Sequence, residues 1–163
     1  MINWVDIVIA VIFAAGVILE TKRGFGRAVF DFAALLVAIK FSPMISQPLS
    51  HALKLLGSTH TNEALWYALT FAVLGGVLLL VGKFIYSTTL VSAEVFDALL
   101  GGLLGVGISI VLCHAFVRVI ALHAGSVDVA PPVVASSAFG SEFLTFDTYH
   151  QLLEAIYRFR SSE

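Results

Sequence analysis

Four long apolar stretches dominate this chain of 163 residues, and they constrain its fold more than any motif does. They cover about residues 5–19, 28–41, 64–86 and 98–122. A helix that crosses a bilayer needs roughly 20 apolar residues. The third and fourth stretches reach that length, and no charge occurs between Ala64 and Gly82. The pattern therefore predicts an integral membrane protein.

Composition and periodicity exclude the two competing fold classes. Charged residues make up 12% of the chain, whereas soluble domains carry about 25%. A soluble four-helix bundle needs a charged outer face on each helix, and three of the stretches have none. A transmembrane β-barrel would show segments of alternating polarity, and nothing here alternates. We expect an all-α integral membrane protein with four transmembrane helices and a C-terminal amphipathic helix.

The charges around the first stretch predict whether it is cleaved and how it is oriented in the membrane. A secretory signal has basic residues before its apolar core, but here the basic residues come afterwards, in Glu20-Thr21-Lys22-Arg23. We therefore expect an uncleaved span. Lys22, Arg23 and Arg27 form the densest basic cluster of the chain. The positive-inside rule places this turn in the cytoplasm, so both termini are predicted to face the periplasm.

Glycine and proline mark the connections between the spans. The sequence Lys22-Arg23-Gly24-Phe25-Gly26-Arg27 predicts a tight turn, because glycine tolerates positive φ. Pro43 and Pro48 predict the end of the second span, and residues 47–56 could then form a short surface helix. Thr61-Asn62-Glu63 is typical of a helix start and precedes the third span.

The sequence divides into a four-span membrane domain, residues 1–122, and a tail, residues 123–163. Pro131-Pro132 has the composition of a linker. Beyond it, residues 149–160 predict an amphipathic helix of about a dozen residues, too short to span. Its apolar face comprises Phe146, Tyr149, Leu153 and Ile156. The helix could lie on the membrane surface and contact a partner, or it could cover the protein's own loops.

Small residues recur at every fourth position in two spans. In the fourth span they are Gly101, Gly105, Ser109 and Cys113, and in the third Ala64, Ala68, Ala72 and Gly76. Small side chains let helix backbones approach closely in lipid. We expect the third and fourth spans to pack against each other through these stripes, or one stripe to form a homo-oligomer interface; packing within the chain is the favoured interpretation.

Ionisable residues in or near the spans are candidates for function, because charges are costly in hydrocarbon. Asp6 also suits the first turn of a helix, and Asp31 can pair with Arg27 one turn earlier. His114 could relay protons, but no acidic partner is evident at its depth, which favours a hydrogen-bonded structural role. Arg118 shares its face and could extend to the outer interface.

The remaining motif classes are not found. The five histidines show no metal-ligand spacing, and phosphate-binding loops and nucleophile elbows are missing. Cys113 is the only cysteine, and no basic stripe suits nucleic acid. We expect no catalytic residue, metal or cofactor. The expected partners are the lipid bilayer and either another membrane protein or a second copy of the chain, with no nucleic acid.

Three landmarks together resemble a known family. They are Asn3-Trp4-Val5-Asp6, Arg23-Gly24-Phe25-Gly26-Arg27, and Asp97-Ala98-Leu99-Leu100-Gly101 followed by Gly105. Over residues 2–122 the chain resembles the colicin V production protein (CvpA) family of bacterial inner-membrane proteins. That family usually has a basic residue after the aspartate of the third landmark, where this chain has Ala98.

The resemblance implies a small non-enzymatic protein that assists toxin production or export, or envelope homeostasis. The alternative is an oligomeric channel or transporter subunit, which should show polar residues converging at mid-bilayer. Only His114 is expected at that depth. The candidate functional or packing residues are Asp6, Arg23, Gly24, Asp97, Gly101, Gly105 and His114.

Overall fold

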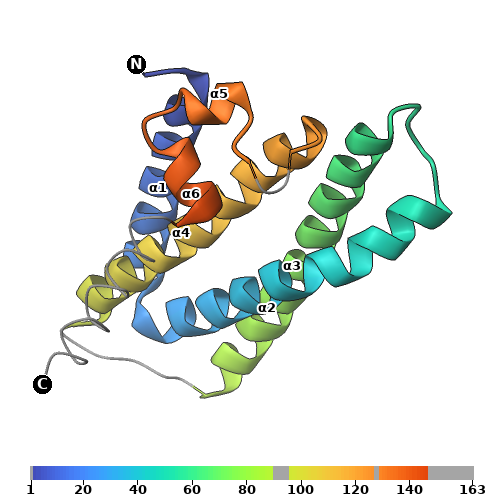
Figure 1. Cartoon of the computed structure of the whole chain (residues 1–163). Coiled ribbons are helices and arrows are strands. Elements are labelled where there is room, and N and C mark those ends of the chain that lie inside the picture. Colours follow the sequence, from blue (N-terminus) through green and yellow to red (C-terminus); the bar gives the residue numbers. More distant parts are fainter. Residues whose placement is uncertain (1, 90–95, 127–128, 147–163) are drawn as a thin grey trace, which may run out of the picture.

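A computed structural model describes residues 2–89, 96–126 and 129–146 (Figure 1). These residues form helices and no strand. The helices are α1 (Trp4–Arg23), α2 (Phe25–Ala52), α3 (Thr59–Thr89), α4 (Asp97–His123), α5 (Pro132–Ala135) and α6 (Gly140–Thr145). The predicted helix at 149–160 lies outside the described residues.

Four of the helices, α1 to α4, are long and apolar enough to cross a membrane. The all-α fold with four spans is therefore confirmed, and each helix extends beyond the apolar stretch that predicted it. Because successive spans run in opposite directions, Gly24 and Asp97 mark one end of the bundle, here called the turn end. Asn3 and Asn62 mark the other, here called the opposite end.

The distribution of side chains is the reverse of that in a soluble protein. Large apolar residues project outward, with Val73, Leu80, Phe84 and Leu99 each at least 65% exposed. Polar and charged residues are buried instead, among them Asp6, Glu20, Asp31, Asn62 and Ser109. Lipid accepts apolar side chains, whereas polar ones are stable only where neighbouring protein groups bind them. The described residues thus form a multi-pass membrane protein.

The prediction that Pro43 and Pro48 end the second span was wrong. α2 continues through both prolines to Ala52, so no separate surface helix forms at 47–56. Prolines are tolerated in transmembrane helices. Two serines near these prolines bind the backbone of the same helix. Ser42 Oγ donates to Ala38 O at 2.6 Å, and Ser50 Oγ donates to Gln47 O at 2.8 Å.

The spans pack in two pairs, which also differ from the prediction. α1 lies along α4, and α2 crosses α3 (Figure 1). A methyl group built on Gly75 of α3 would contact Leu35 and Ala38 of α2. Gly76, a member of the predicted α3 stripe, faces open space. At Gly76 the α3 stripe therefore does not pack against α4, although the two helices contact each other elsewhere.

The start of the tail folds back onto the opposite end of the α1–α4 pair. α5 and α6 lie over these two helices (Figure 1), and Val134 of α5 is fully buried with Val5, Ile9, Cys113 and Val117. Asn3 Nδ2 donates to Val133 O at 2.8 Å. Residues 129–146 are thus packed on the spans rather than forming an open linker, while a domain boundary at 122 stays a prediction.

Candidate functional site

Two of the sequence landmarks meet at the turn end, where α1, α2 and α4 come together. Gly24 joins α1 to α2 with φ 84° and ψ 168°, a backbone conformation that favours glycine. The backbone N–H of Phe25 donates to Asp97 Oδ1 at 3.0 Å. A methyl group on Gly24 would overlap the Asp97 carboxylate. Glycine is therefore required at Gly24 both by its φ and by the neighbouring carboxylate.

Gly101 and Gly105 of α4 lie against the backbone of α1. A methyl group on Gly101 would lie 2.6 Å from Glu20 O, and one on Gly105 would lie 2.9 Å from Val17 Cα. One turn further, Ser109 Oγ donates to Gly105 O at 2.7 Å and approaches Phe13 O at 3.1 Å. The α4 stripe is thus covered by α1. It is an intramolecular interface, as favoured, but with a different partner helix and not between copies.

Four charges gather beside this junction and balance one another. Arg23 Nη1 lies 2.8 Å from Glu20 Oε1 and 3.2 Å from Asp31 Oδ2, and Arg27 Nε lies 3.4 Å from Asp31 Oδ2. The predicted Arg27–Asp31 pair is confirmed. Glu20 and Asp31 are 3% and 1% exposed. Buried carboxylates are costly unless paired, so this cluster depends on α1 and α2 staying together.

Glu20, Arg23 and Asp31 also line a mostly apolar cavity of about 290 Å³ between the four spans. Its other walls include Leu35, Leu79 and Leu112. Glu20 Oε2 and Asp31 Oδ1 are buried without a hydrogen-bond partner among the described residues. The arrangement can hold charge inside the bundle, but the described residues that line the cavity bring no nucleophile to these carboxylates.

At the opposite end, Asp6 links the start of α1 to the tail. Its carboxylate accepts from Asn3 N at 2.9 Å, which completes a capping box with the Asn3 side chain. The other oxygen accepts from Ser137 Oγ at 2.6 Å and from Phe139 N at 3.2 Å. Asp6 is therefore the helix-start residue that was expected, and it also anchors the loop between α5 and α6.

His114 of α4 contacts the tail further from the helix ends than Asp6 does. Its Nδ1 lies 2.7 Å from Phe143 O, and its ring stacks on Phe146 with centroids 5.3 Å apart. Hydrogen bonding to a backbone carbonyl fits the structural role favoured by the sequence. Asp6 and His114 thus contact the same segment, whereas Arg23, Gly24, Asp97, Gly101 and Gly105 cluster at the turn end.

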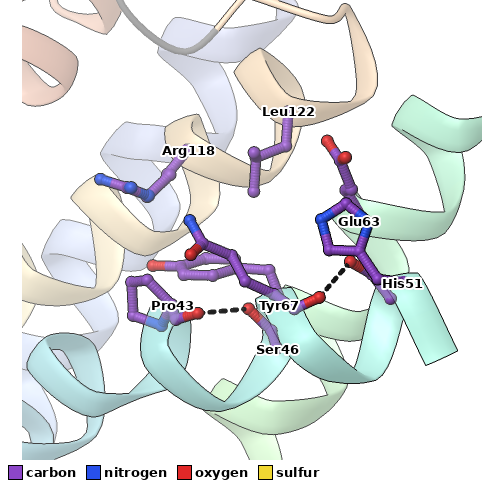
Figure 2. A pocket seen from close by; sticks show the side chains of 9 residues that line it. Pro43, Ser46, His51, Glu63, Tyr67, Arg118 and Leu122 are labelled. Carbon is purple, nitrogen blue, oxygen red and sulfur yellow. Dashed lines mark hydrogen bonds between the residues drawn. The ribbon is translucent and has the colours of Figure 1, made fainter.

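A polar pocket of about 150 Å³ lies between α2, α3 and α4 near the opposite end (Figure 2). Arg118, which could extend to the outer interface, also lines this pocket. Its guanidinium carbon lies 5.7 Å from the centroid of the Tyr67 ring, and its Nε is buried without a partner among the described residues. The Tyr67 hydroxyl is likewise buried and has no hydrogen-bond partner in the described part of the chain. Glu63 and His51 line the other side (Figure 2).

Sequence reasoning missed several of these residues. Tyr67 was not singled out within the third apolar stretch, and Glu20 was noted only as a residue after the first span. Asn62 was interpreted as a helix start, yet it is 2% exposed and binds Ser50 O, Leu53 O and Leu55 N at 2.8, 3.1 and 2.9 Å. A polar residue near a span is a usable signal, but its partner comes from another helix.

Comparison with known proteins assigns the chain to a family. A family model described as "Colicin V production protein" matches residues 5–145, which extends past the spans into the packed tail. No curated protein and no solved structure matches the chain. No group of three or more potential metal ligands gathers in the part of the chain that the structure describes. The chain belongs to the colicin V production protein family.

Proposed function

We propose that this protein is a small, non-enzymatic protein of the bacterial inner membrane that assists colicin V production or export, or maintenance of the cell envelope. The family description supports a link to colicin V production. One observation supports the proposal that the protein is not an enzyme. The landmark residues Arg23, Gly24 and Asp97 converge at one junction, where each contacts a neighbouring helix or turn. At this junction these residues hold neighbouring helices together.

A deletion strain of a colicin V producer tests this proposal. Loss of the gene should reduce toxin activity in the medium, and a plasmid copy should restore it. Measuring the toxin inside the cells separates export from production. Sensitivity to detergent reports on the envelope. Normal secretion together with normal detergent resistance in the deletion strain would refute the proposal.

Location and orientation are tested separately. Separation of inner and outer membranes should place the protein in the inner membrane. Reporter fusions after Arg27 and after Glu163 should give opposite compartments, because the basic turn favours the cytoplasm. A cytoplasmic reporter at Glu163 would overturn the proposed orientation with both termini outside.

The proposed partner is another membrane protein or a second copy of this chain. A pull-down from gently solubilised membranes should recover it. An oligomeric channel is the alternative function, supported by the open face beside Gly76 on α3. Ion flux through liposomes containing the purified protein would favour that alternative, whereas a tight membrane would argue against it.

A further inference from the structure

We propose that the polar pocket beside Tyr67 and Arg118 binds the headgroup of a zwitterionic phospholipid, namely a phosphoethanolamine group. The phosphate lies against Arg118 and Tyr67, and the ammonium lies against Glu63. This inference goes beyond the proposed function and does not depend on it.

The first half of the pocket offers unused donors to an anion. Tyr67 is 1% exposed and its hydroxyl has no partner within the described chain. The same holds for the buried Nε of Arg118, and no carboxylate among the described residues forms an ion pair with this arginine. Buried donors are costly when left unpaired. A phosphate can accept from both, since guanidinium groups suit its geometry.

The second half offers acceptors to a cation. Glu63 lies across the pocket from Arg118 (Figure 2). Ser46 and Ser50 also line it; Ser46 Oγ donates to Pro43 O at 3.4 Å, and Ser50 Oγ donates to Gln47 O at 2.8 Å. Their oxygens are thus left as acceptors, and an ammonium group has three hydrogens to donate. A cation on one wall and an acid on the other match a zwitterion better than a simple anion.

The depth of the pocket favours a lipid over a soluble ligand. Glu63 lies four residues after the start of α3 at Thr59, and Arg118 five residues before the end of α4 at His123. At about 1.5 Å per residue, both lie within about 8 Å of the helix ends, close to the boundary between the hydrocarbon core and the lipid headgroups.

An apolar groove lies deeper along the same helices. Its volume is about 260 Å³, and it is lined by residues that include Phe71 of α3 and Leu112 and Ala115 of α4. These residues lie one to two turns further into the bilayer than Tyr67 and Arg118. A groove of this composition at this depth suits an acyl chain. It is bordered by Ile12 of α1 as well as by α3 and α4, whereas the polar pocket is bordered by α2, α3 and α4.

The test measures lipid binding to the purified full-length protein in detergent by native mass spectrometry. Phosphatidylethanolamine should bind more tightly than phosphatidylglycerol, which lacks the ammonium, and than phosphatidylcholine, whose quaternary nitrogen cannot donate. Arg118→Gln should weaken binding of both ethanolamine and glycerol lipids about ten-fold, the loss of one charged hydrogen bond. Glu63→Gln should remove only the preference for ethanolamine. Lys54→Gln, which removes an exposed cation outside this pocket, is the matched control.

Two further measurements keep the result decisive. Tyr67→Phe removes only the hydroxyl and should weaken binding several-fold, so it replaces Arg118→Gln if that variant does not fold. Soluble phosphoethanolamine should not compete at equal concentration, because it lacks the acyl chains. Equal binding of all three lipids, unchanged affinity in the pocket variants, or competition by the soluble headgroup would each overturn the proposal.

Discussion

Close contact between α1 and α4 predicts that single methyl groups on α4 will separate the two helices. Gly101→Ala would place its new carbon 2.6 Å from Glu20 O, and Gly105→Ala 2.9 Å from Val17 Cα. Both neighbours are backbone atoms, so they cannot rotate away as a flexible side chain could. Overpacking of this kind costs about 1–3 kcal/mol. Gly76→Ala is the matched control, because nothing lies within 4 Å of its new carbon.

A buried cysteine of the protein can report on separation of α1 from α4. Cys113 is the only cysteine and is fully buried, with its thiol 3.8 Å from Ile9 O of α1. A maleimide can reach it only when α1 and α4 open. If opening is a fast equilibrium, a destabilisation of about 1–3 kcal/mol should raise the labelling rate about 5- to 150-fold.

Labelling is measured in detergent for the wild type and the three alanine variants. Gly101→Ala and Gly105→Ala should react faster than the wild type, and Gly76→Ala should react at the wild-type rate or more slowly. If all four proteins label at one rate, the α1–α4 contact does not determine the opening of this interface, and the packing argument fails.

Three other changes test the remaining contacts. Asn62→Ala should destabilise the protein by about 1–3 kcal/mol in unfolding assays, because buried backbone groups lose their partner; unchanged stability would show that water replaces the amide. Asp31→Asn should lower thermal stability in detergent, since Arg27 loses its buried partner, and an unaltered melting temperature would contradict this. Truncation after Phe146 should leave a stable membrane protein, whereas truncation after Ala130 should be degraded because it removes the segment bound to Asp6; equal abundance of both forms would refute that role.

Much of the architecture could be predicted because it depends on local composition. Hydropathy and length locate the four spans, and the glycines of Lys22-Arg23-Gly24-Phe25-Gly26-Arg27 locate the first turn. The Arg27–Asp31 pair was also predictable, since residues four apart on a helix are neighbours. The error at Pro43 and Pro48 has a local cause too. A missing N–H normally ends a helix, but transmembrane helices tolerate proline, because neighbouring helices and local adjustments compensate for it.

The sequence by itself determined that the chain spans a membrane, where its small-residue stripe lies, and which family it resembles. Only the tertiary structure decided that this stripe faces α1 and that Asp97 binds the turn at Gly24. It also brought Tyr67 of α3 to Arg118 of α4 across fifty residues of sequence. The physical reason is that every span is apolar on most sides, so hydropathy does not select partners. Pairing depends on close backbone fit and on buried polar groups, which appear only when helices are placed together.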